Sequence, residues 1–402
     1  MSKQIIIDNG TYSIKYGSIL DDKPKHIQNC IIKTNDKKIY FGNSLNSKIP
    51  FQDPSSLIIK RPIENGQLTQ WFLEKQIWDD EFDDYLYDSD LIYMETPVTF
   101  TKFQNMTDQV LFEEYGVNSL YRCSSASLVP WYTTTTKSTY NDFQLVIDSG
   151  FESTWVIPMV FGIPYTKGIK KMNIGGKFLN GYLREVISFR HYNVMDELLL
   201  VNDIKEKVCY ISDDYDLSLK KIKEIKEKKT PKDSMSLNYI LPDHKDSNYG
   251  YTLTNEQLSN LNYMDSQILK LSDERFSIPE VLFQPQLSGV YKSGIVKTIQ
   301  ESLNNIPDLL KPLLCANVAC IGGNFNIPGF KERLTQELNK VIPINDEIKI
   351  FDNGNLDNSE IGWFAAKSFF NKNGFEKVCI TKKEYDEFGP EYTQEKFGYK
   401  MS

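Results

Sequence analysis

The stretch that decides the fold is QIIIDNGTYSIKYG (residues 4–17), where three isoleucines, an aspartate and a glycine turn precede an alternating segment. The isoleucines are typical of a buried strand, and the alternation over residues 12–19 is typical of its hairpin partner. The same order returns in FQLVIDSGFESTWVIPM (residues 143–159), so that Asp8 and Asp148 occupy equivalent places. One strand–turn–strand element therefore occurs twice, which indicates two related halves.

A third strand with a glycine turn follows in NVACIGGNFNIPGF (residues 317–330). Glycine suits positions where the backbone bends tightly or approaches a ligand. In α/β proteins the carboxyl ends of strands meet at a crevice where ligands bind. Two facing hairpins could hold a polyphosphate through backbone N–H groups, and Asp8 and Asp148 could hold Mg²⁺ through its waters. The alternative is a pair of ordinary hairpin turns, which favour the same residue types.

Length and composition limit the class of protein. The 402 residues exceed the usual size of a single core and favour two lobes. A net charge of −8 argues against a general nucleic-acid binder. No apolar run approaches the length of a membrane span, so we expect no membrane association. The six cysteines are scattered, which argues against a structural zinc site and favours buried thiols in a reducing compartment.

Residues 219–233 concentrate seven lysines against two glutamates and one aspartate. One interpretation is a solvated helix that ends at Pro231. The other is a contact for DNA or for an acidic partner. The lysines that would make this contact are Lys220, Lys221, Lys223 and Lys226.

The order of Asp-Asn-Gly, Asp-Ser-Gly, DIKEKVCY (residues 203–210) and GGNFNIPGF (residues 322–330) resembles that of actin and actin-related proteins. The segments RPIENGQLTQW (61–71), ERFSIPEVLFQP (274–285) and TKKEYDEFGP (381–390) extend the resemblance over nearly the whole chain. It implies the α/β actin-like fold of actin, hexokinase and Hsp-type ATPases. In that fold, duplicated ribonuclease H-like halves form four subdomains around a central nucleotide cleft.

The resemblance also implies limits for the four subdomains. Residues 1–30, 62–140 and 338–402 would form subdomain 1, and residues 31–61 a short subdomain 2. Residues 141–175 and 270–337 would form subdomain 3, and residues 176–269 subdomain 4.

The cofactor implied by the family is ATP or ADP with Mg²⁺, held here as a static ligand, with an empty cleft as the alternative. A ligand bound only by the folded form stabilises that form, so a site without catalysis can still serve folding. The matching positions are the first acid and phosphate loop (Asp8, Gly10, Thr11, Lys15), the second acid and loop (Asp148, Ser149, Gly150), the adenosine-side pair (Lys205, Glu206) and the turn beneath the nucleotide (Gly322, Gly323, Asn324, Phe325).

Five positions depart from the pattern of actin. Glycine in the first loop is replaced by Tyr12, and an acid and a glycine in the second loop are replaced by Phe151 and Glu152. We expect Glu152 to repel the terminal phosphate. The histidine near the attacking water is replaced by Trp155, and the glutamine that orients this water by Ser125, which is too short to reach it. The other interpretation of Ser125 is a packed hydroxyl bonded to backbone. Phosphoryl transfer needs an oriented water and stabilised charge, so we expect no useful ATPase activity.

Within the family, QNCIIK (28–33), LNYILPD (237–243) and the stretch 304–330 resemble the subfamily of actin-related protein six. This resemblance implies a nuclear scaffold subunit of a Swr-type complex, which exchanges a core histone for its variant. The implied partners are the motor subunit, a HIT-type zinc-finger subunit and the nucleosome, and cytoplasm is the second implied location.

Two other functions are weighed against the scaffold. A filament-forming actin-like ATPase would need the long loop of subdomain 2, which is much shorter here, so we expect no homopolymer. A sugar kinase of the wider actin-like class would need an aspartate base in the cleft, and the sequence offers no clear candidate.

Overall fold

The structure is a computed structural model. It describes residues 3–34, 37–42, 57–82, 85–132, 142–228, 235–242, 249–259, 267–342, 348–351, 353–354 and 356–398. Part of the predicted subdomain 2, residues 35–36 and 43–56, lies outside this range. The predicted subdomain limits stay predictions.

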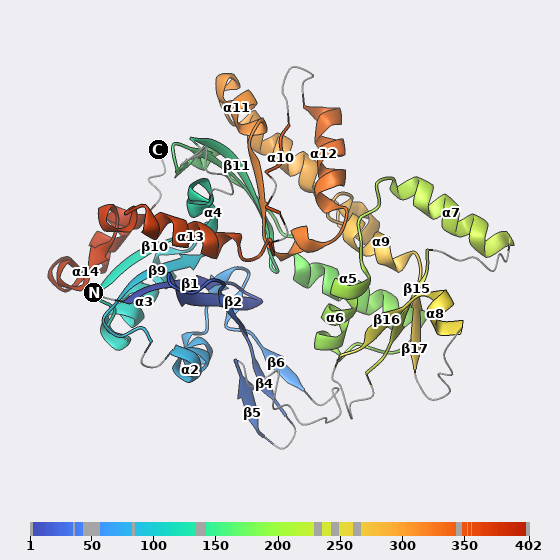
Figure 1. The fold of residues 1–402 in the computed structure, drawn as a ribbon, viewed down its shortest axis with the longest axis horizontal. Coiled ribbons are helices and arrows are strands. Elements are labelled where there is room, and N and C mark those ends of the chain that lie inside the picture. Colours follow the sequence, from blue (N-terminus) through green and yellow to red (C-terminus); the bar gives the residue numbers. More distant parts are fainter. Residues whose placement is uncertain are drawn as a thin grey trace.

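Two sheets form the centres of two lobes (Figure 1). The first sheet contains the hairpin of residues 4–17, and two later strands run parallel to the first strand of that hairpin. Its order is β19 (Ile380–Thr381), β10 (Ser119–Ser124), β9 (Ser89–Glu95), β1 (Lys3–Asn9), β2 (Ser13–Ser18) and β3 (Lys25–Gln28).

The second sheet repeats this plan. The antiparallel hairpin of β11 (Phe143–Ser149) and β12 (Thr154–Val160) is joined by β18 (Val318–Ile321), which lies parallel to β11. Two short strands, β13 (Ile163–Pro164) and β14 (Lys170–Met172), pair with β12. In the two hairpins Asp8 lies opposite Lys15 and Asp148 lies opposite Trp155, so the duplication predicted from the sequence is confirmed.

The strands β1 and β11 are buried on both faces, which explains their uninterrupted apolar runs. Ile5 and Ile7 pack in a core with the helices on the outer face of the first sheet, whereas Ile6 points into a core between the two sheets. That central core also contains Val146 of β11 and Trp363. The sheets therefore share one layer of helices, α4 (Ser125–Leu128) and α13 (Ile361–Asn371).

The remaining elements surround these layers. Helices α2, α3 and α14 cover the first sheet, and helices α5, α6, α9, α10 and α12 contribute to the core behind the second. Their bounds are α2 (Trp71–Phe82), α3 (Thr101–Gln109), α5 (Gly176–Arg190), α6 (Leu198–Val208), α7 (Tyr215–Lys228), α8 (Asn255–Ser259), α9 (Glu274–Glu280), α10 (Ile295–Asn304), α11 (Lys311–Cys315), α12 (Phe330–Val341) and α14 (Lys382–Phe397).

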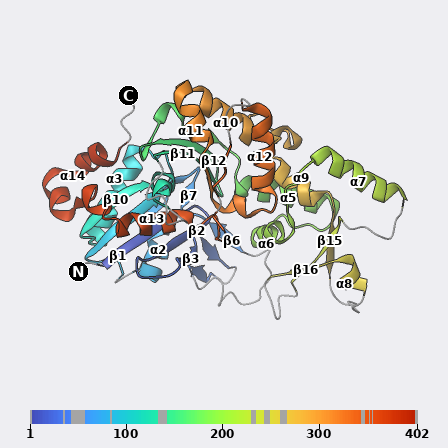
Figure 2. The ribbon, with the colours of Figure 1, turned by 45° about the horizontal axis from the view of Figure 1, so that its top comes forward.

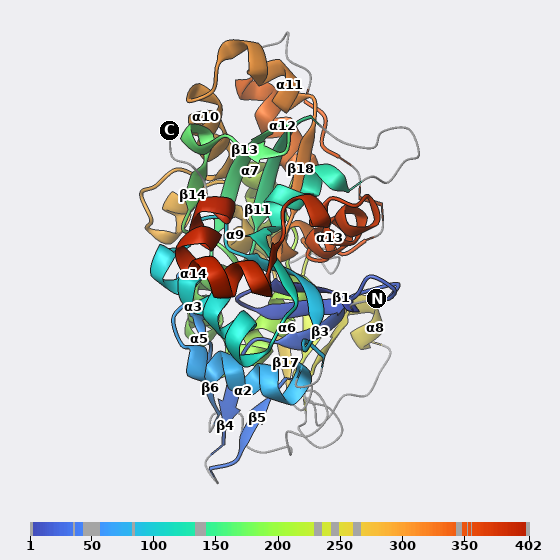
Figure 3. The same ribbon diagram turned by 90° about the vertical axis from the view of Figure 1, so that its left-hand side faces the viewer.

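Three small sheets lie outside the two main ones. The sheet at the lower end of the first lobe, at the far end from α11 (Figure 3), contains β4 (Ile31–Lys33), β5 (Ile39–Phe41) and β6 (Ile58–Lys60). The sheet beside α6 in the second lobe (Figure 1) contains β15 (Leu237–Ile240), β16 (Tyr251–Leu253) and β17 (Ile268–Leu271). The third is the pair β7 (Ile63–Glu64) and β8 (Gln67–Leu68).

The lysine-rich segment forms helix α7, which projects from the second lobe in Figures 1 and 2. The described part of the helix reaches Lys228, and the predicted stop at Pro231 lies outside the described residues. Over the described part of the chain, no helix is both long enough and apolar enough to cross a membrane.

A buried carboxyl in α2 makes the stability of the first lobe depend on pH. Burial raises the pKa of Glu74 to about 7, and hydrogen bonds from Asn9, Asn29 and Trp78 oppose this rise only in part. Glu74 imposes no penalty below its ordinary pKa of 4.5. Between pH 4.5 and about 7 the folded protein holds a proton that the unfolded chain has already lost, so the free energy of unfolding falls over this range, and the full cost is present above about pH 7.

We predict that Glu74→Gln stabilises the protein at about pH 8 by up to about 3 kcal/mol relative to wild type, with a much smaller gain at about pH 5. Urea unfolding at a series of pH values measures the difference. Glu376→Gln, which removes an exposed carboxyl, is the control. A gain for Glu74→Gln that does not change with pH would contradict this assignment of the charge.

Candidate functional site

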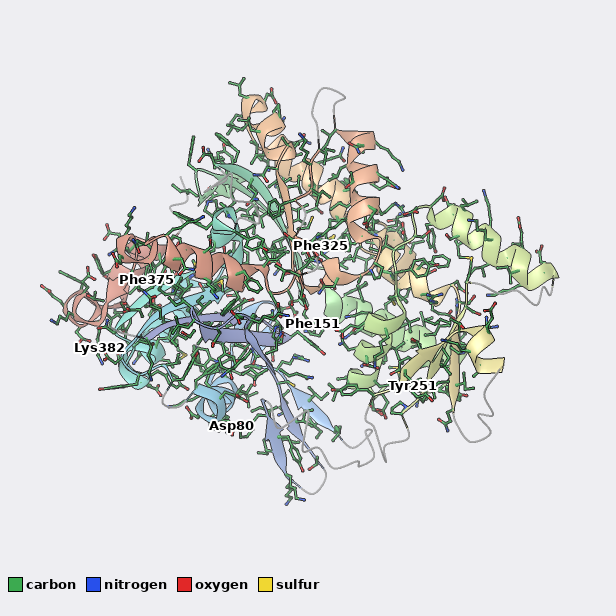
Figure 4. The ribbon with its side chains drawn as sticks, viewed as in Figure 1. Asp80, Phe151, Tyr251, Phe325, Phe375 and Lys382 are labelled. Atoms are coloured by element: carbon green, nitrogen blue, oxygen red, sulfur yellow. The ribbon has the colours of Figure 1, made fainter. Side chains whose placement is uncertain are left out.

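The two hairpin loops meet at a cavity of about 470 Å³ between the lobes. Phe151 of the second loop lies at the centre of the molecule, where the lobes meet (Figure 4). The cavity brings together most of the site residues predicted from the sequence: Asp8, Gly10, Thr11, Lys15, Ser125, Asp148, Gly150, Lys205, Glu206, Gly322, Gly323 and Asn324.

Ser149 and Phe325, the other two predicted residues, do not line the cavity. The hydroxyl of Ser149 lies 2.9 Å from that of Thr154 and accepts a hydrogen bond from the side chain of Asn324 at 3.0 Å. Phe325 is buried against Phe330, with ring centroids 4.4 Å apart. Both side chains therefore lie outside the cavity lining and stabilise the loops through these contacts.

The two acids at the strand ends differ in their surroundings. Asp8 forms an ion pair with Lys15 at 3.4 Å. Burial, and then the charge of Asp8, raise the pKa of Asp148 to about 7, while Lys15 lowers it. Without a cation, Asp148 is therefore partly protonated at neutral pH. This donor set suits a hydrated divalent cation, because such an ion would favour the charged form of both groups.

The third turn approaches the second loop so closely that it requires glycine. Gly322 has a φ of +95°, which side chains rarely adopt. A Cβ atom there would lie 2.4 Å from the carbonyl oxygen of Ser149 and 2.9 Å from Asp148 Oδ1. At the next position, Gly323, an added Cβ would meet no described atom within 4 Å. Gly322 thus sets the distance between the turn and Asp148.

The two bulky replacements in the loops contact each other across the cleft. The rings of Tyr12 and Phe151 are 5.0 Å apart between centroids and tilted by 45°. The guanidinium of Arg61 lies 4.8 Å from the centroid of Tyr12 and 5.0 Å from that of Phe151. This contact could not be predicted from local sequence patterns, because the two residues belong to different halves.

The other three departures have partners of their own. Lys177 donates to both carboxylate oxygens of Glu152, at 3.1 and 3.3 Å, so the expected repulsion of a phosphate is weaker than predicted. The hydroxyl of Ser125 donates to Asp8 at 3.4 Å, so the interpretation as a hydroxyl bonded to backbone is wrong. Trp155 is buried, and its ring centroid lies 5.2 Å from Lys171 Nζ.

Asn202 is a site residue that the sequence analysis missed. Its amide nitrogen donates to the Tyr12 hydroxyl at 2.8 Å and to Glu206 at 2.8 Å. Its amide oxygen accepts from Lys205 at 3.0 Å, and burial lowers the pKa of this lysine. Asn202 lies three and four residues before the pair in α6, a spacing that places all three on one helix face and could have revealed it.

We predict that Gly322→Ala lowers the free energy of unfolding by about 2 kcal/mol or more, because it adds both backbone strain and a steric clash. Gly323→Ala is the matched control and should change stability by less than about 0.5 kcal/mol. Chemical denaturation of both variants makes the comparison. Equal effects would show that the close approach at Gly322 is not rigid.

Comparison with known proteins agrees with this geometry. The family model described as "Actin" matches residues 1–398. A protein of Candida glabrata named "Actin-like protein ARP6" is 40% identical, with 98% of each chain covered. Proteins of the same name from Kluyveromyces lactis (39% identical, 99% of this chain and 98% of the relative) and Saccharomyces cerevisiae (37%, 98% of each) are also similar. The chain therefore belongs to the actin family, among the ARP6 actin-like proteins.

Proposed function

We propose that the protein is a non-catalytic scaffold subunit of an ATP-dependent chromatin remodelling complex that exchanges a core histone of nucleosomes for its variant form. Similarity to ARP6 proteins over nearly the full length of both chains is the observation that carries the proposal. The remodelling role comes from the resemblance of the segments at residues 28–33, 237–243 and 304–330 to that subfamily. The proposed location is the nucleus, with cytoplasm as a second one.

The state of the cleft supports a role without catalysis. An actin-like ATPase needs a side chain that orients the attacking water and donors that stabilise the transferring phosphoryl group. At the water-orienting position the hydroxyl of Ser125 is bonded to Asp8, and the indole of Trp155 replaces an imidazole. Ser125 has no amide that could orient the water, and the indole nitrogen of Trp155 is only a donor, so it cannot accept a proton from the water. We therefore expect no ATP turnover by this chain.

As a scaffold, the chain would act through binding partners. The proposed partners are the motor subunit and a HIT-type zinc-finger subunit, and a homopolymer is not expected.

The direct test is a gentle affinity purification of the tagged chain from its own cells, with mass spectrometry of the eluate. We predict stoichiometric recovery of a Snf-type motor, paired AAA-type ATPases and a HIT zinc-finger protein, all absent from a purification with the tag alone. If the chain were recovered alone, or only with copies of itself, the scaffold proposal would fail.

We also propose that α7 contacts the nucleosome. Lys220, Lys221, Lys223 and Lys226 are all exposed on this projecting helix. Intramolecular pairs reduce the local charge, because Lys226 lies 3.2 Å from Asp273 and Lys223 lies 3.9 Å from Glu227. The contact would therefore be one part of a larger interface.

Replacing all four lysines by serine should weaken nucleosome binding by the complex and flatten its salt dependence, because fewer counterions are released. Replacing the same four by arginine keeps the charge and is the matched control. Binding is measured by electrophoretic mobility at several salt concentrations. A serine variant with the affinity and salt slope of wild type would exclude α7 from the interface.

A further inference from the structure

The residues of the cleft suit Mg²⁺ and the adenosine of a nucleotide, but they do not suit its phosphates. Asp8 and Asp148 provide oxygen ligands, and Lys205 and Glu206 line the adenosine side. The phosphates would need the space between the first and second loops, where backbone N–H groups from both halves converge. Tyr12 of the first loop and Phe151 of the second both line the cavity, and their rings contact each other between the loops.

Arg61 binds this ring pair to the first lobe. Its Nη1 atom donates to the carbonyl oxygens of Thr11, Tyr12 and Asn29, at 3.2, 3.0 and 3.1 Å. The same guanidinium lies over both rings, where a cation is attracted to the π face. We call Tyr12, Arg61, Phe151 and Asn202 the aromatic clasp.

The clasp also reaches the side of the cleft where adenosine would bind. The hydroxyl of Tyr12 is bonded to Asn202, which in turn is bonded to both Lys205 and Glu206. Burial raises the pKa of Tyr12, so this hydroxyl stays neutral and bonded through the physiological range. The side chains expected to recognise a nucleoside are therefore already joined, through Asn202, to a residue of the chain itself.

Charge in the cleft also disfavours a polyphosphate. Six acidic side chains line the cavity, from Asp8, Glu95, Asp148, Glu152, Glu206 and Asp357, and the two lysines that line it are Lys15 and Lys205. Three of these acids carry less free charge, because Arg122 pairs with Glu95, Lys177 pairs with Glu152, and the raised pKa of Asp148 leaves it partly protonated at neutral pH. Asp8, Glu206 and Asp357 still face an incoming phosphate. Lys15 is paired with Asp8, and Lys205 is bonded to Asn202. A ligand with several negative charges would have to compete for both lysines in a site of low dielectric, where repulsion is strong.

We propose that the aromatic clasp replaces the nucleotide as the connection between the two halves, so that the cleft closes without ATP or ADP. In an actin-like cleft a bound nucleotide would contact both loops and hold the lobes together. Here the ring contact between Tyr12 and Phe151 joins the loops, and the bond from Asn202 to Tyr12 joins the first loop to α6. The inference concerns the chain itself and does not depend on the remodelling role.

The test compares thermal unfolding of the full chain with and without millimolar Mg-ATP, together with a fluorescence titration with an N-methylanthraniloyl derivative of ADP. Wild type should show no shift of Tm with Mg-ATP and no saturable fluorescence change. Tyr12→Gly/Phe151→Gly should lower Tm by about 3 °C or more and should gain a saturable rise of Tm with Mg-ATP. Tyr12→Phe, which keeps the ring but loses the hydroxyl, should lower Tm slightly and remain unresponsive to nucleotide.

Phe72→Ala removes an aromatic ring that is 75% exposed and does not line the cavity, and it controls for the loss of a ring as such. A saturable response of wild type to Mg-ATP would overturn the proposal. So would a double variant with the Tm of wild type, because the clasp would then connect nothing. If the double variant does not fold, Tyr12→Ala is judged by the same criterion: Tm must fall relative to wild type.

Discussion

The strands β1 and β11 are buried on both faces, and this constraint fixes the positions of the two loops on which the cleft depends. Ile5 and Ile7 are held by the outer helices, while Ile6 and Val146 are held in the core shared by both sheets. A strand that is packed on both faces cannot tilt or shift by one residue without exposing its apolar side chains. The loops after the two strands are therefore presented to each other across a cavity of defined width.

What fills that cavity decides how the lobes are connected. A nucleotide would stabilise the closed form by an amount that grows with its concentration. The contact of Tyr12 with Phe151 is part of the chain, so its contribution does not depend on any ligand. Arg61 and Asn202 extend the contact into backbone and into α6. A fold that elsewhere binds nucleotide would here retain the shape of the closed cleft as a fixed property, which suits a subunit that acts through its surfaces.

The sequence predicted the duplicated hairpins, the third glycine turn and most of the cavity lining, because these depend on local patterns: apolar runs, turn residues and strand ends. It did not predict the partners of the replaced residues. The contacts of Tyr12 with Phe151 and of Glu152 with Lys177 join segments whose proximity only the tertiary structure sets. The role of Arg61 is hidden for the same reason, since its partners are carbonyl oxygens of the first loop and of Asn29. Asn202 alone had a local signal, its helical spacing from Lys205 and Glu206.

The central claim, closure of the cleft without nucleotide, is tested most directly by the nucleotide content of the protein isolated from its own cells. The protein is purified under native conditions without added nucleotide, then denatured, and the released ATP and ADP are separated and quantified against the protein. The account predicts an amount far below one nucleotide per chain. Recovery of one nucleotide per chain would contradict it and would show that the rings of Tyr12 and Phe151 move apart to admit the phosphates.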